Sequence, residues 1–575
     1  MTGTSTTPDS LIVPPETTIT PVDTYPYNLG PWSRPILTSN PIAQTWFDRG
    51  LLWTYGFHHE EAVRCFQQSI LADPRCSMAL WGYAYARGPN YNRPYHLLDR
   101  DDLPVMIRSC RRACELAIKY AQDPLERSLA DALIERFDDS PGTTFESRTK
   151  AWGDKMERVY LDHPKDLDIT SIYADSRMNI APWKLWDIHT GTPNENAHTS
   201  ETRRILSSAL HDARTKTHAG VLHLWIHLME LSPQPELALA PGDLLRGLIP
   251  DAGHLHHMPS HIDLLVGDYR RAISTNWEAH IADEKYASLT SKVDFYTAYR
   301  LHNLAIIVFA GMFNGQYDHA IRAAGKMESI AHHILTRAGG SADWCETVLS
   351  TRPHIYVRFG KWKEILELDF PEDEGLYCVT TATLHYARGV AHSVLGNIEQ
   401  AEECQILFDR AIEAVPESRM NYPNNARQIL KVGQAMLAGE LEYRKGNYEI
   451  AFDHLRESIK RGDNLVYAEP SGWMQPPRHA YAALLMEQDR IEEASEVYAA
   501  DLGLSTTLPR PLRHPNNVWA LHGYHECLRR MGRDDAADAV QLQLDIALAV
   551  SDIPIKASCY CRSIPDKSEQ AACCE

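Results

Sequence analysis

The sequence predicts an all-α protein, built as an irregular helical-repeat superhelix (an α-solenoid) that encloses a central cavity. Three observations support this prediction. A short turn-like segment recurs along the chain, and helix-favouring Ala, Leu, Glu and Arg dominate the stretches between its copies. Runs of alternating β-branched residues, which would indicate strands, are missing. Two pairs of histidines also repeat at one fixed spacing.

The recurrent segment has a helix-stopping residue, usually glycine, followed five positions later by a small residue. This pattern is typical of a turn between two closely packed helices. The seven copies begin at Phe57, Gly267, Gly315, Gly396, Gly446, Asp489 and Gly532. The spacing between equivalent alanines is 48 residues from Ala272 to Ala320, 50 from Ala401 to Ala451 and 43 from Ala451 to Ala494. A tetratricopeptide repeat of two antiparallel helices has a period of about 34 residues. We therefore predict tetratricopeptide-like repeats with long helices or loops, able to close around a small molecule.

The histidine pairs His223/His227 and His257/His261 keep the tight period, since both members lie 34 residues apart. Residues four apart share one helix face, and equivalent positions of neighbouring repeats stack side by side. Four imidazoles are therefore expected on one inner surface. The first pair lies among Leu, Trp, Ile and Met residues, where an unpaired imidazole is costly to bury. Clustered imidazole in such surroundings favours a metal site.

Two further residues join this pattern. Glu230 continues the stripe of the first pair, and His254 precedes His257 and His261 at helical spacing. Pro259 interrupts the second segment, so the helix either kinks there or begins there. In the second case His254 and His257 would approach the site from a loop. We predict that His223, His227, His254, His257 and His261 are the metal ligands.

Imidazole ligands without cysteine suit iron, copper or zinc, so a divalent transition metal is the expected cofactor. With Glu230 the set could be a two-histidine, one-carboxylate iron site, or it could be a histidine-only site closer to copper. We therefore favour a metal-dependent oxidoreductase or oxygenase acting on a small organic molecule. Two alternatives stay open. One is a non-catalytic repeat scaffold that binds a peptide or partner protein in its groove. The other is a zinc hydrolase or lyase with Glu230 or Asp175 as general base.

Several residues outside the histidine segments are weaker candidates. Arg177 and Arg478 could anchor a substrate carboxylate, and Tyr299 and His302 could line the same pocket. His58 and His59 are expected to be exposed at a repeat turn.

The histidine segments resemble the signature of a large family of bacterial and fungal tetratricopeptide-repeat proteins. The two matching stretches read His-Ala-Gly-Val-Leu-His-Leu-Trp-Ile-His-Leu-Met-Glu (218–230) and Ala-Gly-His-Leu-His-His-Met-Pro-Ser-His-Ile (252–262). The flanking segments 88–92, 173–179 and 515–520 are similar as well, so the likeness covers about residues 41–545. Ala219 and Leu228 stand where the family pattern has proline and alanine. The resemblance implies the repeat fold and implies no particular reaction.

The two ends of the chain are expected to lie outside the repeat domain. Residues 1–40 are rich in Thr, Pro and Ser, which predicts a disordered N-terminal arm before a repeat domain at 41–545. Residues 546–575 form a tail with four of the twelve cysteines, Cys559, Cys561, Cys573 and Cys574, which could hold a soft metal or form disulfides. Both ends should be dispensable for folding.

Charge and hydropathy indicate the class of partner. The net charge of −19 argues against nucleic acid or an anionic membrane surface as partner. No apolar stretch reaches the roughly 20 residues that span a bilayer. A cytoplasmic protein with a small-molecule substrate is therefore expected, and the oligomeric state is left open.

Overall fold

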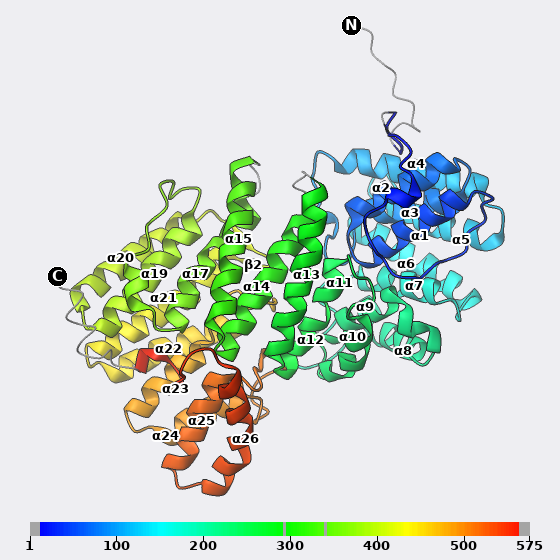
Figure 1. Ribbon diagram of the computed structural model, residues 1–575. Helices are drawn as coiled ribbons and strands as arrows, with labels where there is room; N and C mark the ends of the chain where they lie inside the picture. Colours follow the sequence, from blue (N-terminus) through cyan, green and yellow to red (C-terminus); the bar gives the residue numbers. More distant parts are fainter. Residues whose placement is uncertain (1–11, 16, 291–294, 338–341, 563–575) are drawn as a thin grey trace. The chain divides into compact units, whose positions relative to one another are not determined.

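In the computed structural model, the described residues are 12–15, 17–290, 295–337 and 342–562. Within them the regular structure is helical, apart from one short antiparallel hairpin of β1 (Met420–Asn421) and β2 (Asn424–Asn425) and two isolated bridges. The all-α helical-repeat prediction is confirmed (Figure 1). None of the described helices is long and apolar enough to span a bilayer.

The described chain divides into two compact units, which we call unit 1 and unit 2. Unit 1 comprises the described residues up to Ile262 together with Glu278–Tyr296, and unit 2 comprises Asp263–Trp277 and the described residues from Thr297 onward. The helices of unit 1 are α1 (Pro41–Tyr55), α2 (His59–Ala72), α3 (Ser77–Arg87), α4 (Leu103–Tyr120), α5 (Pro124–Leu133), α6 (Phe145–Asp162), α7 (Leu167–Met178), α8 (Thr199–Ala209), α9 (Ala219–Met229), α10 (Leu239–Leu245) and α11 (Gly253–His257).

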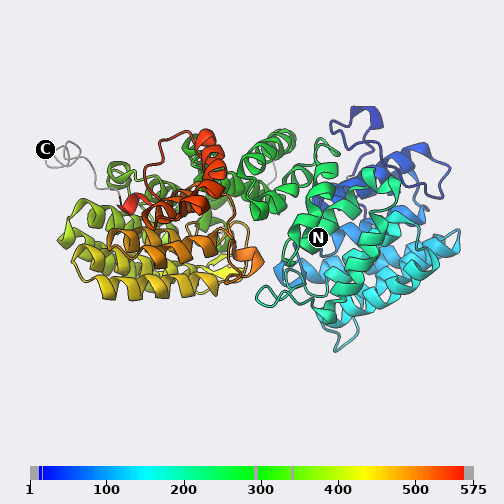
Figure 2. The ribbon, with the colours of Figure 1, turned by 90° about the horizontal axis from the view of Figure 1, so that it is seen from below.

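The boundary between the units runs through α12 (Pro259–Val266) and α13 (Tyr269–Leu289), and α14 begins beside it (Tyr296–Asn314). The helices of unit 2 are α15 (Tyr317–Arg337), α16 (Ala342–Cys345), α17 (Thr351–Arg358), α18 (Trp362–Leu366), α19 (Cys378–Leu395), α20 (Ile398–Ala414), α21 (Ala426–Arg444), α22 (Tyr448–Asp463), α23 (Pro477–Glu487), α24 (Ile491–Asp501), α25 (Val518–Arg530) and α26 (Asp534–Val550). Helices α19 to α22, yellow-green to yellow in Figure 2, pack side by side as successive antiparallel neighbours.

The recurrent turn is the device that makes these helix pairs. All seven predicted turns are present, and the first residue of each has a left-handed backbone, with φ between 53° at Phe57 and 84° at Gly446. In each copy the next backbone N–H donates to the carbonyl oxygen five residues earlier, which closes the preceding helix. The alanine at the end of each copy is fully buried. Gly360 forms a further turn of this kind, which the pattern missed because Ile365 takes the alanine position.

The left-handed turns predict opposite effects for two substitutions. A side chain at φ near +84° strains the backbone of Gly446, and a Cβ there would contact nothing within 4 Å. Gly446→Ala should therefore lower the free energy of unfolding by about 1 kcal/mol. Asp489, at φ 58°, bears the same strain already, so Asp489→Gly should raise it by about 0.5 kcal/mol. Thermal unfolding followed by circular dichroism checks both signs. A stabilising Gly446→Ala would contradict this account.

The described part of the N-terminal arm is packed against unit 1, so the prediction of disorder is wrong for residues 12–15 and 17–40. The Tyr25 hydroxyl donates to Glu61 at 2.8 Å and accepts from the indole N–H of Trp53. Arg34 forms ion pairs at 2.9 Å with both Asp166 and Asp168. The composition was misleading because the aromatic and arginine side chains between the prolines find partners on the helices. The first eleven residues lie outside the described part of the chain.

Asp168, at the start of α7, connects the arm to the helices. Its buried carboxylate accepts hydrogen bonds from Tyr55 at 2.5 Å, from the His218 Nε2–H at 3.1 Å and from the Trp32 indole, in addition to the pair with Arg34. Burial opposes ionisation, but the His218 hydrogen bond and the nearby positive charges outweigh it. They hold the pKa of Asp168 well below its usual range.

This network predicts an acid-sensitive contribution to stability. A lowered folded-state pKa stabilises the fold above the unfolded value of about 4, and this contribution is lost as the pH falls through the folded-state pKa. Asp168→Asn should lower the free energy of unfolding at pH 7 by about 2 kcal/mol, because the donors around residue 168 lose a charged acceptor while Arg34 keeps its pair with Asp166. The difference from wild type should shrink below pH 4. Urea unfolding at pH 7 and pH 3 measures both effects.

The exposed Asp162→Asn variant is the matched control and should unfold like wild type at both pH values. An Asp168→Asn protein as stable as wild type at pH 7 would show that the carboxylate does not tether the arm.

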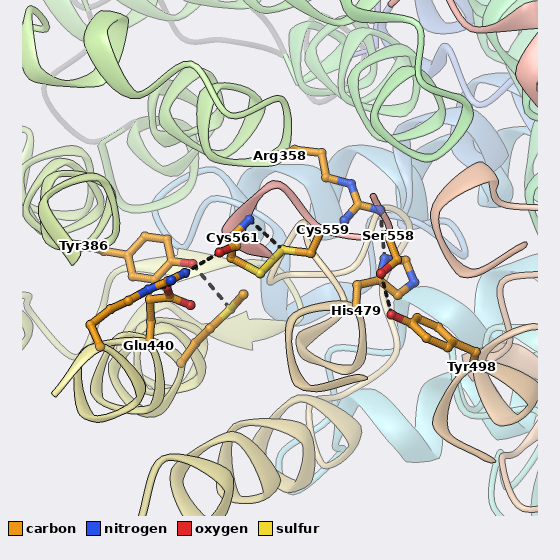
Figure 3. The surroundings of a disulfide bond; sticks show 10 residues. Arg358, Tyr386, Glu440, His479, Tyr498, Ser558, Cys559 and Cys561 are labelled. Atoms are coloured by element: carbon orange, nitrogen blue, oxygen red, sulfur yellow. Dashed lines mark hydrogen bonds and ion pairs between the residues drawn. A yellow bond between two sulfur atoms is a disulfide. The ribbon is translucent and has the colours of Figure 1, made fainter. Parts of the chain in front are cut away.

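The C-terminal boundary also differs from the sequence prediction. α26 continues to Val550, and the residues after it up to 562 pack against unit 2. Arg562 pairs with Glu526 at 2.7 Å, and Cys559 forms a disulfide with Cys561 (Figure 3). The expected tail is therefore docked over its described part, because its polar residues find partners on α15, α24 and α25. Cys573 and Cys574 lie outside the described residues.

Candidate metal centre

The first histidine pair lies on α9, in the interior of unit 1. The helix begins at Ala219 and is capped by His218, whose Nδ1 accepts from the backbone N–H of Val221. It packs closely on α1 and α7, because a Cβ at Gly220 would lie 2.5 Å from the Ser171 hydroxyl and 2.8 Å from the Tyr55 ring. Glycine is therefore required here, and the close packing buries every residue of α9.

The second segment is divided at Pro259, which starts α12, while His254 and His257 lie on the one-turn helix α11. Of the two predicted alternatives, the one in which a helix begins at Pro259 is correct. The residues before the proline form a short helix, however, and not the expected loop. The backbone N–H of His254 donates to the Tyr296 hydroxyl at 3.2 Å, and that hydroxyl donates to Asp283. These bonds hold α11 in place.

The structure brings three imidazoles together. His223, His227 and His254 each offer one ring nitrogen, and these three atoms lie within 4.8 Å of one another. All three side chains are at most 2% exposed. The ring centroids of His223 lie 4.8 Å from those of His227 and 5.0 Å from those of His254.

Hydrogen bonds determine which nitrogen is free in two of these rings. The Nδ1 of His223 lies 2.6 Å from the Tyr55 carbonyl oxygen, which can only accept, so the proton is on Nδ1. The Nδ1 of His227 likewise donates to Glu230 at 3.2 Å. Both Nε2 atoms therefore carry lone pairs, and both are buried without a hydrogen-bond partner among the described residues.

Glu230 supports the cluster from behind. Its two carboxylate oxygens accept from the Nδ1 atoms of His227 and His261, the second at 2.7 Å. Burial disfavours its charge, but the two imidazoles outweigh burial and lower the pKa of Glu230 below its usual value. A carboxylate that receives the far nitrogen of an imidazole orients that ring and fixes its tautomer. Glu230 thus occupies the place of an orienting partner.

The other two predicted ligands form a pair. The Nε2 of His261 lies 2.7 Å from the Nε2 of His257. Because the Nδ1 of His261 donates to Glu230, its Nε2 accepts the His257 proton when the ring is neutral. The ring centroids of His254 and His257 lie 5.6 Å apart, so the pair adjoins the three-histidine cluster. The clustering that the spacing predicts is present, and it separates into a triad and a hydrogen-bonded pair.

Burial keeps two members of the triad neutral. It lowers the pKa of His223 well below the usual value, with the neighbouring His227 acting in the same direction. Burial and then His223 do the same for His254. Neutral imidazole is the form that binds a metal ion.

Phe57 covers the triad. Its ring stacks on His227 and His254 at centroid distances of 5.7 and 5.6 Å and lies 4.5 Å from His223. It comes from the first of the left-handed turns, between α1 and α2. The next two residues, His58 and His59, are 1% and 7% exposed, so their predicted exposure is wrong. The turn inserts into unit 1 rather than lying on its surface.

The remaining predicted residues of unit 1 have other partners. Asp175 on α7 is buried, which raises its pKa, and it is hydrogen-bonded by Tyr85 and Asn179 at 2.8 Å. Arg177 is fully buried and pairs with Asp154 and Glu157. This argues against a role in anchoring substrate, because both terminal nitrogens of its guanidinium already form ion pairs.

The last three candidates belong to unit 2. Tyr299 and His302 lie on α14, and Arg478 on α23 pairs with Asp463 of α22 at 2.5 Å. Arg478 lines a cavity within unit 2 that is described below.

The triad presents three imidazole nitrogen donors and no carboxylate. This donor set suits a copper or zinc ion with one or more positions left for water or substrate. Because Glu230 is engaged by two imidazoles, the iron arrangement with one carboxylate ligand is the less compatible of the predicted sets. The sequence analysis did not identify Phe57 or the Tyr55 carbonyl oxygen as parts of this site. The available signal was the first copy of the turn, which has Phe57 where most copies have glycine.

Comparison with known proteins adds little. No family model and no curated protein matches the chain. Among solved structures, a human IFIT1 dimer with m7Gppp-AAAA is 12% identical, with a TM-score of 0.30 over 90% of this chain and 92% of that one. A Naa15/Naa10 structure bound to HypK-THB is 10% identical, with a TM-score of 0.20 over 88% and 70% of the two chains. At these TM-scores neither likeness supports a functional argument.

Proposed function

We propose that unit 1 binds one divalent transition-metal ion through His223, His227 and His254, and that the protein is a metal-dependent enzyme. The observation that carries this proposal is the pair of buried Nε2 lone pairs, each aligned by an Nδ1–H bond on the far side of its ring. Buried polar atoms without partners are costly. A metal ion held by these two Nε2 atoms, with a ring nitrogen of His254 as the third ligand, satisfies both lone pairs.

The chemistry follows from the donor set. Three histidines leave at least one coordination position open, which is the arrangement of catalytic rather than structural sites. With copper or iron the site would serve an oxidoreductase or oxygenase acting on a small organic molecule, and with zinc it would activate a water for hydrolysis or elimination. The oxidoreductase remains our first choice because the donors are all imidazole.

A second function is favoured by one observation, the depth of the site. The three imidazoles are nearly inaccessible and Phe57 lies against all of them. A fully enclosed ion would stiffen a non-catalytic scaffold that binds a peptide or partner protein elsewhere. The two readings differ in whether an external molecule can reach the metal.

The metal itself is tested by substitution. His223→Ala and His227→Ala each remove one of the two aligned lone pairs, so we expect metal bound by the untagged wild-type protein to be lost. Elemental analysis after dialysis against copper, zinc or iron salts measures this. Glu230→Gln removes the carboxylate that orients His227 and should weaken binding about 10- to 100-fold.

The exposed His211→Ala variant is the matched control and should keep the wild-type metal content. Circular dichroism confirms that each variant is folded. Folded His223→Ala and His227→Ala proteins with undiminished metal would refute the proposed site.

Access to the metal separates enzyme from scaffold. Cobalt(II) is a suitable probe because its visible absorption reports the number and kind of ligands. If a position is open, azide should shift the bands of the cobalt-loaded protein. An unchanged spectrum would favour the scaffold, and azide binding only in Phe57→Ala would show that the Phe57 ring closes the site.

A further inference from the structure

Unit 2 contains a cavity that no part of the proposed metal chemistry uses. Its volume is about 100 Å³ and it is partly open to solvent. Its apolar wall includes Leu264, Leu265, Phe309, Phe313 and Trp473. A closed apolar cavity of about 150 Å³ holds a single benzene ring, and this cavity is smaller but opens to solvent on one side. The size and lining of the cavity therefore suit one aromatic ring.

One side of this cavity carries a histidine held by a buried carboxylate. The Nδ1 of His514 donates to Asp501 at 2.8 Å, and its backbone N–H donates to the Asp501 carbonyl oxygen. Asp501 is 1% exposed, and Asn517 donates to it at 3.0 Å. His514 therefore has a fixed ring position and a fixed tautomer.

Behind Asp501 lies a chain of buried hydrogen bonds. The Nε2–H of His479 donates to Asp501 at 2.8 Å. The Nδ1 of His479 accepts from the Arg358 guanidinium at 2.7 Å, a contact shown in Figure 3. Burial lowers the pKa of His479 to about 4, so this ring is neutral at pH 7. Arg358 and Asp501 thus compensate each other's charge through His479.

One polar group remains for a ligand. Among the described residues the Nε2 of His514 makes no hydrogen bond, and with the proton on Nδ1 it is an acceptor. A hydroxyl group can donate to it.

The charges argue for a neutral ligand. Arg478, which also lines the cavity, is neutralised by Asp463 through two hydrogen bonds. Arg358 is already matched by Asp501. Arg513 and Glu469 line the cavity as well, so the lining carries two arginines and two acids and has no net formal charge. A neutral ligand leaves this balance intact, whereas a carboxylate would upset it.

From this geometry we infer that unit 2 binds a small, neutral hydroxyaromatic molecule, whose ring fills the apolar cavity and whose hydroxyl donates to the Nε2 of His514. The lining of this cavity comes from residues of unit 2.

Phenol is the probe, and toluene is the matched ligand without the hydroxyl. Titration calorimetry on the full-length, chelator-treated protein at pH 7 should show one phenol bound per chain. Toluene should bind about tenfold more weakly, the effect of one hydrogen bond to a neutral group. This comparison needs no variant. Equal affinity of the two ligands, or no phenol binding, overturns the inference.

Two variants locate the site. His514→Phe should reduce phenol affinity about tenfold, to the level of toluene, and leave toluene binding unchanged. Leu265→Trp fills the cavity and should abolish binding of both ligands. The exposed His333→Ala variant is the control and should bind like wild type. Phenol binding that persists unchanged in a folded His514→Phe or Leu265→Trp protein would place the ligand elsewhere and refute the inference.

Discussion

The left-handed turn is the constraint on which the helix pairs of unit 2 depend, and its one copy in unit 1, at Phe57, joins α1 to α2. Each copy ends one helix with a backbone hydrogen bond and starts the next with a buried alanine, so the helix pairs follow from a single residue's φ. Glycine adopts this φ without strain, and five of the seven copies have it. At Phe57 a bulky side chain bears a cost of about 1–2 kcal/mol instead. The ring that this strain positions is the one that covers the three imidazoles, which connects the irregular turn with the site.

Much of this architecture could be predicted because its signals are local. The turn residues and the 34-residue echo between His223 and His257 are features of short segments, and helix periodicity turns them into shared faces. The clustering survives the break at Pro259 because α11 and α12 together still carry the histidines past α9. The spacing could not show which of these residues are candidate ligands and which one orients the rings. Glu230 receives the Nδ1 atoms of His227 and His261, and this depends on ring orientations that no spacing encodes.

The errors share one physical cause. Arg34, in a proline-rich segment, was assigned to a disordered arm, yet it pairs with Asp168 more than a hundred residues away. The sequence predicts a substrate-binding role for Arg177, yet its guanidinium forms ion pairs with two acidic side chains of α6. The cluster around Asp501 escaped notice altogether, because Arg358 and His514 are distant in sequence and match no short motif. The role of such a residue depends on polar partners that are distant in the sequence, and a single sequence does not show which residues these partners are.

Both units use the same arrangement, a buried carboxylate between two imidazoles. Glu230 accepts from His227 and His261, and Asp501 accepts from His479 and His514. In each case the imidazoles outweigh burial and lower the pKa of the carboxyl group, so it stays ionised and aligns both rings. The consequence depends on what the opposite ring nitrogen meets. In unit 1 the His227 nitrogen converges with two further imidazoles, which suits a cation. In unit 2 the His514 ring borders an apolar cavity, which suits a neutral molecule that donates one hydrogen bond. The same carboxylate–imidazole arrangement, which fixes the tautomer of a histidine, can thus support cation binding in one unit and binding of a neutral molecule in the other.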